Sequence, residues 1–232
     1  MQEAALNLFM QLLPLIIGTA VVPSLIILVI LFLQSDRGLL KASAFVGGMV
    51  SWRLFMLTIF VYYAYLFEML FGLKIPERLH FALLSLLGII LLTIGAYILT
   101  KKRHMSGTSP GLLKVIDRAN PPIAFALGVV LMAVGLKHYI FMIGAMQDLE
   151  KSGILGAKWT LAMIFFIVAA ELLVLLPILI YLLMPGRSEA ILGSFKNLLD
   201  KHSSMITTIF CFIAGIFFLW RAFTLLKQEQ LL

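Results

Sequence analysis

The sequence predicts an all-α membrane protein with six transmembrane helices, arranged as a 3+3 inverted repeat. The first observation is composition: of 232 residues, 62% are hydrophobic and only 12% are charged. Soluble domains are about 45–50% apolar and about 25% charged. The second observation is the mean hydropathy of +1.08. The third is that the apolar residues gather in stretches on both sides of one basic segment, so the chain is predicted to form a single integral membrane domain over residues 1–232.

Six stretches are long and apolar enough to cross a bilayer. A membrane-spanning helix needs about 20 consecutive, mostly apolar residues. The stretches that meet this requirement are 8–33, 40–65, 79–100, 122–147, 159–183 and 205–226.

Several of these spans contain residues that interrupt helices. Pro23, followed by Ser24, lies in the middle of the first span. Proline removes a backbone donor and bends a helix, and a helix broken near the midplane can present its free backbone groups to a ligand. A simple packing kink is the alternative for this pair. We also expect helix kinks at Gly135 in the fourth span and at Pro177 in the fifth, since neighbouring groups in a bundle can satisfy the freed carbonyls.

A basic linker divides the chain into two halves of three spans. The first half covers 1–100, the linker 101–120 and the second half 121–232. Asn120, followed by Pro121 and Pro122, predicts the N-cap and first turn of the fourth span. The residues before the second span, 38–42, weakly resemble those before the fifth, 153–157. Because three is an odd number of spans, two similar halves must be inverted, which is a signature of transporters.

The distribution of Lys and Arg predicts the orientation in the cell (cytoplasmic) membrane. The loops after spans one, three and five carry ten of these residues, and the opposite side carries six. Cytoplasmic loops are enriched in Lys and Arg. We therefore expect both termini outside.

The candidate functional residues are ionisable side chains inside the spans. Arg53 lies twelve residues beyond Lys41, or roughly 18 Å along a helix, near the middle of a core about 30 Å thick. Glu171 lies twelve residues beyond Trp159, at a similar depth. Such groups usually face a bundle interior or a water-filled cavity, and they mark transport pathways. The alternative is a buried ion pair that only fixes helix register.

Two more such residues, Lys137 and His138, follow Gly135 in the fourth span. Adjacent residues on a helix point about 100° apart, so both can face one cavity only at its edge or where the helix is broken. One interpretation is a site for an anionic substrate or a proton relay. The other pairs Lys137 with Glu171 and bonds His138 to a backbone carbonyl, as polar side chains often do in bundles. We expect Arg53, Lys137 and Glu171 to converge near the midplane, with His138 in local hydrogen bonding.

Other classes of function lack support in the sequence. Residues 107–111 match G-x-S-x-G, but they lie in a basic loop rather than in a strand-to-helix turn. The chain has a single cysteine, Cys211, and four scattered histidines. We therefore expect no enzymatic activity, no metal site and no cofactor. The net charge of +7 is explained by topology and anionic headgroups, so no nucleic acid partner is expected.

Three segments carry a family resemblance. Residues 113–128 resemble the middle of the GAP family, also called the Sap or sulfolipid-addressing family. Residues 176–187 are similar to this family too, as is the opening half with Pro23, 35–38 and 45–48. The family belongs to the lysine exporter (LysE) superfamily. The resemblance leads us to expect an Asn-Pro-Lys-Asn-like motif in the fourth span. Residues 135–138 are Gly-Leu-Lys-His, so Lys137 matches this motif and the Asn-Pro before it does not.

The resemblance implies an inverted-repeat transporter fold and export of a small solute or movement of a (glyco)lipid across the envelope. The leading hypothesis is therefore a secondary transporter that works by alternating access between the two halves. The alternative is a non-transporting membrane scaffold or assembly factor of an envelope pathway. The expected partners are membrane lipids and a small-molecule or lipid substrate, and a homo-oligomer stays an open alternative.

Overall fold

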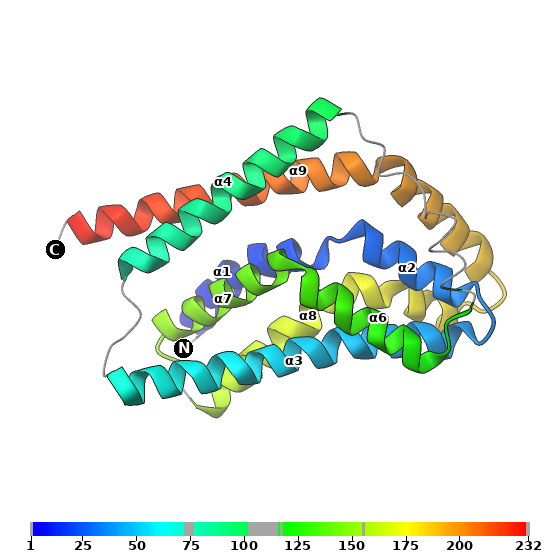
Figure 1. The fold of residues 1–232 in the computed structure, drawn as a ribbon, viewed down its shortest axis with the longest axis horizontal. Coiled ribbons are helices and arrows are strands. Elements are labelled where there is room, and N and C mark those ends of the chain that lie inside the picture. The colour runs from blue at the N-terminus through cyan, green and yellow to red at the C-terminus, as the bar shows by residue number, and fades with distance from the viewer. Residues whose placement is uncertain (1, 72–76, 102–115, 117, 155, 231–232) are drawn as a thin grey trace. The chain divides into compact units, whose positions relative to one another are not determined.

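All of the described secondary structure is helical, which confirms the predicted all-α class (Figure 1). The computed structural model describes residues 2–71, 77–101, 116, 118–154 and 156–230. Its main helices are α1 (Gln2–Ala20), α2 (Pro23–Leu33), α3 (Gly38–Phe71), α4 (Glu77–Lys101), α6 (Pro121–Val134), α7 (Leu136–Lys151), α8 (Ala157–Leu183) and α9 (Ser188–Gln230).

Several of these helices have the length and composition of membrane spans. Among the described residues, three single helical segments qualify, and the bent pair of α1 and α2 makes a fourth if it is counted as one span. Residues Gly88–Thr100 and Pro121–Val134 form shorter apolar helices. This set indicates a multi-pass membrane protein. The three qualifying segments are Gly38–Tyr63, Ala157–Leu183 and Ser204–Thr224.

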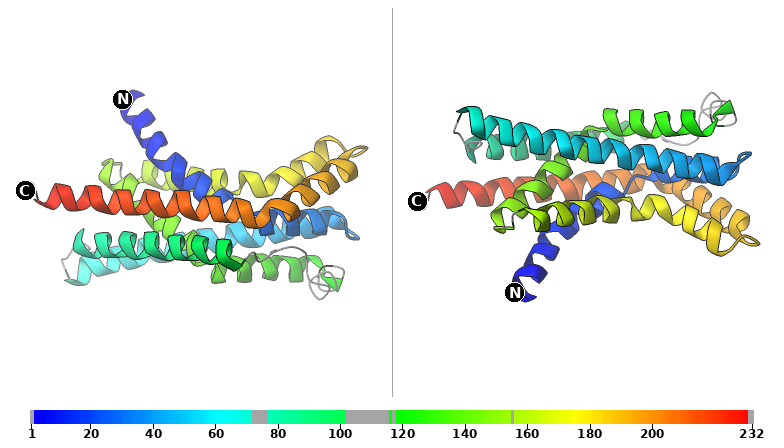
Figure 2. Two further views of the ribbon diagram at one scale, coloured as in Figure 1. Left: turned by 90° about the horizontal axis from the view of Figure 1, so that it is seen from above. Right: turned by 90° about the horizontal axis from the view of Figure 1, so that it is seen from below.

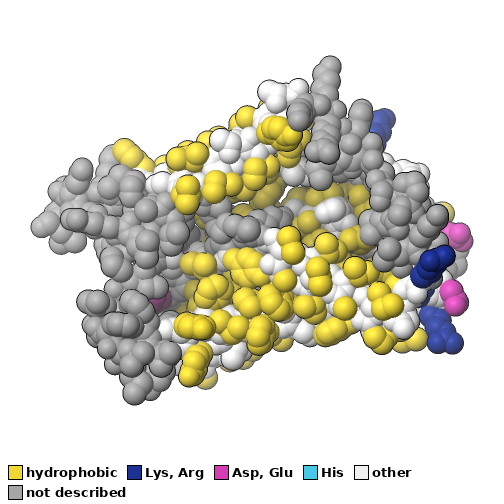
Figure 3. All heavy atoms as spheres, viewed as in Figure 1, with side chains coloured by type: hydrophobic (Ala, Val, Ile, Leu, Met, Phe, Trp, Pro, Cys, Tyr) yellow, Lys and Arg dark blue, Asp and Glu magenta, His cyan; other side chains and the backbone are white. Residues whose placement is uncertain are grey.

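The helices form two compact units. The first comprises residues 1–54 and 107–201, and the second comprises residues 55–106 and 202–232. The long helices α3 and α9 therefore contribute to both. In Figure 3, hydrophobic side chains cover the visible face of α3 and α6. The exposed hydrophobic side chains of these two helices include Leu54, Phe125 and Val130, as expected of helices that contact lipid tails.

The first predicted span is broken, as the sequence led us to expect at Pro23. Helix α1 ends at Ala20 and α2 begins at Pro23, with a bend of 50° between them (Figure 2). Val22 has an extended φ of −132°, which is the conformation that a following proline favours. Its N–H donates to the carbonyl of Ala20 at 2.9 Å, and Pro23 has no N–H. The carbonyls of Gly18 and Thr19 therefore lose their regular helical donors.

The fourth predicted span is broken too. Its start is as expected, because the Asn120 side chain accepts a hydrogen bond from the Ile123 N–H at 3.0 Å. Helix α6 ends at Val134 and α7 begins at Leu136. Between them Gly135 has φ −76° and ψ 82°, outside the helical region. Helices α1 and α7 contact each other at Gly18, two residues before the end of α1, since a Cβ added there would lie 2.6 Å from Cζ of Phe141.

Helices α3 and α6 approach each other through a reciprocal pair of glycines. A Cβ added at Gly48 would press on the carbonyl oxygen of Phe125, and one added at Gly128 would press on that of Phe45. In the second unit, α4 and α9 meet in the same way. A Cβ at Gly88 would lie 3.0 Å from the carbonyl oxygen of Gly215, and one at Gly215 would lie 3.1 Å from that of Gly88. Small residues allow such close backbone contact in membranes, where packing rather than the hydrophobic effect drives helix association.

The glycine contact gives a matched pair of substitutions on α3. Gly48→Ala should destabilise the folded protein by about 1–3 kcal/mol, because α3 and α6 must move apart. Gly47→Ala should be neutral or stabilising, since a Cβ there meets nothing within 4 Å and Ala is the better helix former. Unfolding in mixed micelles measures both. Equal effects of the two substitutions would contradict the close packing of α3 on α6.

Candidate functional site

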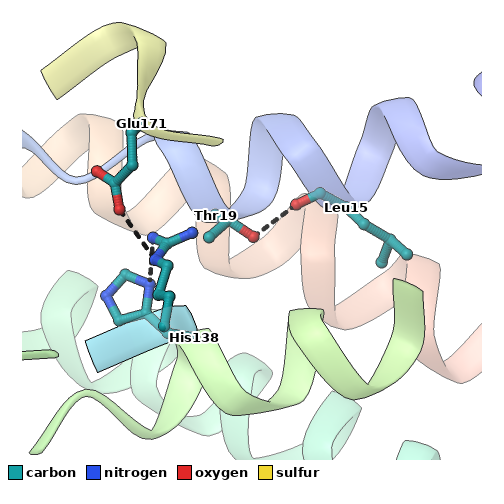
Figure 4. A network of polar contacts seen from close by, with 5 residues as sticks. Leu15, Thr19, His138 and Glu171 are labelled. Atoms are coloured by element: carbon teal, nitrogen blue, oxygen red, sulfur yellow. Dashed lines mark hydrogen bonds and ion pairs between the residues drawn. The ribbon is translucent and has the colours of Figure 1, made fainter. Parts of the chain in front are cut away.

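The centre of the first unit contains an ion pair between α3 and α8. The Arg53 Nε lies 2.9 Å from the Glu171 Oε1, and the two side chains are only 6% and 1% exposed. Figure 4 shows the polar contacts around this ion pair at close range. Glu171 lies near the middle of α8, and Arg53 lies inside the predicted span of α3. The structure thus brings together the two charges that the sequence places at equal depth.

His138, in the first turn of α7, joins this ion pair from a third helix. The three side chains Arg53, Glu171 and His138 form the polar group. The Arg53 Nη2 lies 3.3 Å from the His138 Nδ1, and the histidine is 8% exposed. Arginine has only donors, so Nδ1 must accept. The contact therefore requires a neutral imidazole with its proton on Nε2. In the described structure, His138 contacts the arginine directly, which is more than the local hydrogen bonding expected of it.

Gly135 makes room for this histidine. A Cβ added at Gly135 would lie 2.6 Å from the His138 Cδ2. The His138 N–H also donates to the Gly135 carbonyl at 3.0 Å. The break between α6 and α7 and the position of the imidazole therefore depend on the same glycine.

The carboxylate of Glu171 is only partly satisfied. Within the described part of the chain, its Oε2 is buried and has no hydrogen-bond partner. The Nε–H of Arg53 does not meet the alignment of a hydrogen bond to Oε1, so the 2.9 Å contact is an electrostatic attraction between charges. Buried polar atoms in folded proteins nearly always have partners. The unused oxygen therefore gives this carboxylate the capacity to bind something further.

A second contact ties α3 to the break between α6 and α7. The Trp52 Nε1 donates to the Tyr139 Oη at 2.9 Å, and this hydroxyl donates to the Ala133 carbonyl at 2.8 Å. Ala133 lies in the last turn of α6, where a helix leaves carbonyls without internal donors. Adjacent residues of α3, Trp52 and Arg53, thus contact adjacent residues of α7, Tyr139 and His138. The sequence reasoning did not include Trp52 or Tyr139, although their place next to candidate residues was a usable signal.

Removing the Tyr139 hydroxyl should therefore weaken the connection between α3, α6 and α7 at the break around Gly135. We expect Tyr139→Phe to destabilise the protein by about 1–3 kcal/mol, because the part-buried Ala133 carbonyl loses its donor and the Trp52 N–H loses its acceptor. Tyr181→Phe on α8 is the matched control, since no hydrogen bond of its hydroxyl is found among the described residues. Thermal unfolding in detergent compares the two. A loss for Tyr181→Phe as large as that for Tyr139→Phe would contradict this role.

The two helices on either side of the first break, α1 and α2, are neighbours of α8, the helix that carries Glu171. Helix α8 packs against both α1 and α2. Thr19, near the end of α1, lies beside the polar group in Figure 4, is buried and donates to the Leu15 carbonyl at 2.7 Å. Sequence reasoning missed it. The two candidates at the break differ, since Pro23 is buried and Ser24 is exposed.

The remaining sequence candidates lie as follows. The backbone of Lys137 belongs to α7, but its side chain lies outside the described residues. Pro177 is buried inside α8, which continues through it to Leu183. The described residues contain no group of three His, Cys, Asp or Glu side chains that could hold a metal ion.

No curated protein and no solved structure gives a significant match to the chain. The model of one family, described as "Sap, sulfolipid-1-addressing protein", matches residues 12–224. This range includes α2, α3, α6, α7 and α8, and therefore every residue of the polar group around Arg53. The resemblance found in the sequence is confirmed: the chain belongs to the Sap, sulfolipid-1-addressing protein family.

Proposed function

We propose that this protein is a secondary transporter that moves an anionic solute or (glyco)lipid across the cytoplasmic membrane. One observation carries the proposal: Arg53, Glu171 and His138 meet, buried, from three different helices. Ionisable groups inside spans are costly and mark substrate or ion pathways. The family description names a sulfolipid, and a sulfated glycolipid is an anion that a guanidinium can bind.

The arrangement of helices supports six spans in two inverted halves. Counting α1 with α2 and α6 with α7 as single broken spans, each half consists of a broken helix, a long helix and a third helix. The second helix of each half carries one buried charge, Arg53 on α3 and Glu171 on α8. Transporters built from inverted repeats bind substrate near the midplane at discontinuous helices.

The chemistry of the group fits an anionic headgroup. The planar guanidinium of arginine presents several donors in a fork that matches sulfate, phosphate or carboxylate oxygens. The broken helices α1–α2 and α6–α7 supply backbone near the same group. In this proposal the two halves rock around the fixed site, exposing it to each side in turn.

A membrane scaffold is the second candidate function. Its support is that the Arg53–Glu171 and Trp52–Tyr139 contacts join α3 to α8 and to α7. In that case the buried charges only hold the bundle together, and the protein moves no solute. The two candidates differ in whether any flux depends on the protein.

The test is flux in reconstituted vesicles. The purified protein is placed in phosphatidylcholine vesicles with a fluorescent sulfated glycolipid, and the fraction that reaches the opposite leaflet is followed by a membrane-impermeant quencher. We expect protein-dependent movement that is faster for the sulfated lipid than for the same lipid without sulfate. Equal rates with and without the protein would support the scaffold instead.

A further inference from the structure

We propose that anion binding at Arg53 is coupled to protonation of Glu171: the anion replaces the carboxylate on the guanidinium, and Glu171 takes up one proton from water. This inference rests on the proposed function and adds its coupling ion. One proton would then travel with each negative charge, so the transfer step would be electroneutral.

The charges of the group lead to this coupling. In the resting arrangement the positive charge of Arg53 is balanced by Glu171 at 2.9 Å, while His138 accepts from Arg53 and is neutral. An added anion would leave two negative charges sharing one buried guanidinium. Two like charges in one buried site disfavour joint ionisation, and the usual solution is that one acid holds a proton. A sulfate cannot take that proton near neutral pH, so Glu171 must.

The carboxylate is held loosely enough to be displaced. Among the described residues, no hydrogen bond anchors either oxygen of Glu171. Its one attachment within the described part of the chain is the contact with Arg53, so an anion that replaces it there breaks no further bond to a described residue.

A protonated Glu171 would also find acceptors. Its O–H would be a new donor on α8, and α8 packs against both α1 and α2. The break between those helices leaves the carbonyls of Gly18 and Thr19 without their regular donors. In this proposal, these two backbone oxygens accept the hydrogen bond of the protonated carboxyl group.

Few other groups can produce the same pH response. Arg53 on α3 keeps its charge at any physiological pH. Residues 4–33, which include α2 and most of α1, contain no titratable side chain. On α8 itself, Lys158 and Tyr181 lie near the ends. On α7, His138, Tyr139 and the buried Asp148 are titratable, and the side chain of Lys137 lies outside the described residues. Asp148 lies ten residues beyond His138, or about 15 Å along the helix.

The test measures binding and proton uptake together. The probe is octyl sulfate, whose charge does not change between pH 5 and 8, added to the protein in phosphatidylcholine nanodiscs, with empty nanodiscs subtracted. For the natural sequence we expect uptake of about one proton per bound sulfate and an affinity that rises about tenfold for each unit of pH decrease while the ion pair is charged. Octyl glucoside, which has the same chain without a charge, should not compete.

Glu171→Gln is the informative variant. It should bind octyl sulfate at all of these pH values and take up no proton. Glu189→Gln, which removes an exposed carboxylate in the first turn of α9, should keep the proton uptake. If Glu171→Gln fails to fold, the proton count of the natural sequence decides alone. Binding without proton uptake, or no binding of octyl sulfate, would overturn the proposal. Proton-linked binding without lipid flux would overturn transport instead, and flux without proton uptake would overturn only the coupling.

Discussion

Replacement of Glu171 by Leu should destabilise the folded protein by about 3–5 kcal/mol, the usual effect of removing one partner of a buried ion pair. The reason is that the guanidinium of Arg53 stays buried, at 5% exposure, without a negative partner. The neutral His138 accepts one hydrogen bond from it but does not balance its charge. Reversible unfolding in mixed micelles gives the change in the free energy of unfolding.

The double variant Arg53→Met and Glu171→Leu should recover most of this loss. Buried ion pairs can often be replaced by apolar residues of similar volume at little cost in stability, because the desolvation penalty disappears together with the attraction. The double-mutant cycle isolates the interaction between the two side chains. A double variant as unstable as Glu171→Leu alone would mean that the pair is not the cause of the loss.

The same double variant should lose transport although it folds. With Arg53 and Glu171 both apolar, the site has no group to receive a sulfate, so movement of the sulfated glycolipid should fall to the rate of protein-free vesicles. Glu189→Gln, at an exposed position in the first turn of α9, removes a carboxylate outside the group and should transport normally. The flux assay in vesicles compares the three proteins.

This second result separates the two candidate functions. A folded double variant with normal flux would show that the charges are only structural, as the scaffold requires. A folded double variant without flux would assign the charges to the pathway. Stability and flux therefore have to be measured on the same preparation.

Sequence patterns were sufficient for the depth of the charges but not for their partners. Arg53 and Glu171 could be placed at one level because Arg53 lies twelve residues beyond Lys41 and Glu171 lies twelve residues beyond Trp159. The pattern could not decide whether Lys137 or His138 faces them, since the two point about 100° apart and the choice depends on how α7 rotates after the break. In the structure His138 contacts Arg53.

Breaks within a span could also be predicted from the sequence, whereas contacts between distant segments could not. Pro23 and Gly135 interrupt helices for reasons that lie in their own backbones. Thr19 and Tyr139 acquire their places only when α1, α3 and α7 pack together. The span count shows a similar limit. The described helices supply three or four long apolar spans, depending on whether the bent pair α1–α2 counts as one. The predicted span 122–147 is divided at Gly135 into two shorter helices, and the predicted span 79–100 is represented, among the described residues, by the shorter apolar helix Gly88–Thr100.

In the proposed function, an anionic lipid headgroup reaches Arg53 inside the membrane. The most direct measurement uses a sulfated glycolipid with a diazirine next to the sulfate, photolysed in vesicles with the protein, followed by mass spectrometry of the labelled peptides. Labels should appear on the buried residues around Arg53, namely Thr19, His138 and Glu171, and those on Thr19 and His138 should be lost in the double variant. Labels confined to outward-facing positions such as Leu172, which is 53% exposed, would contradict it.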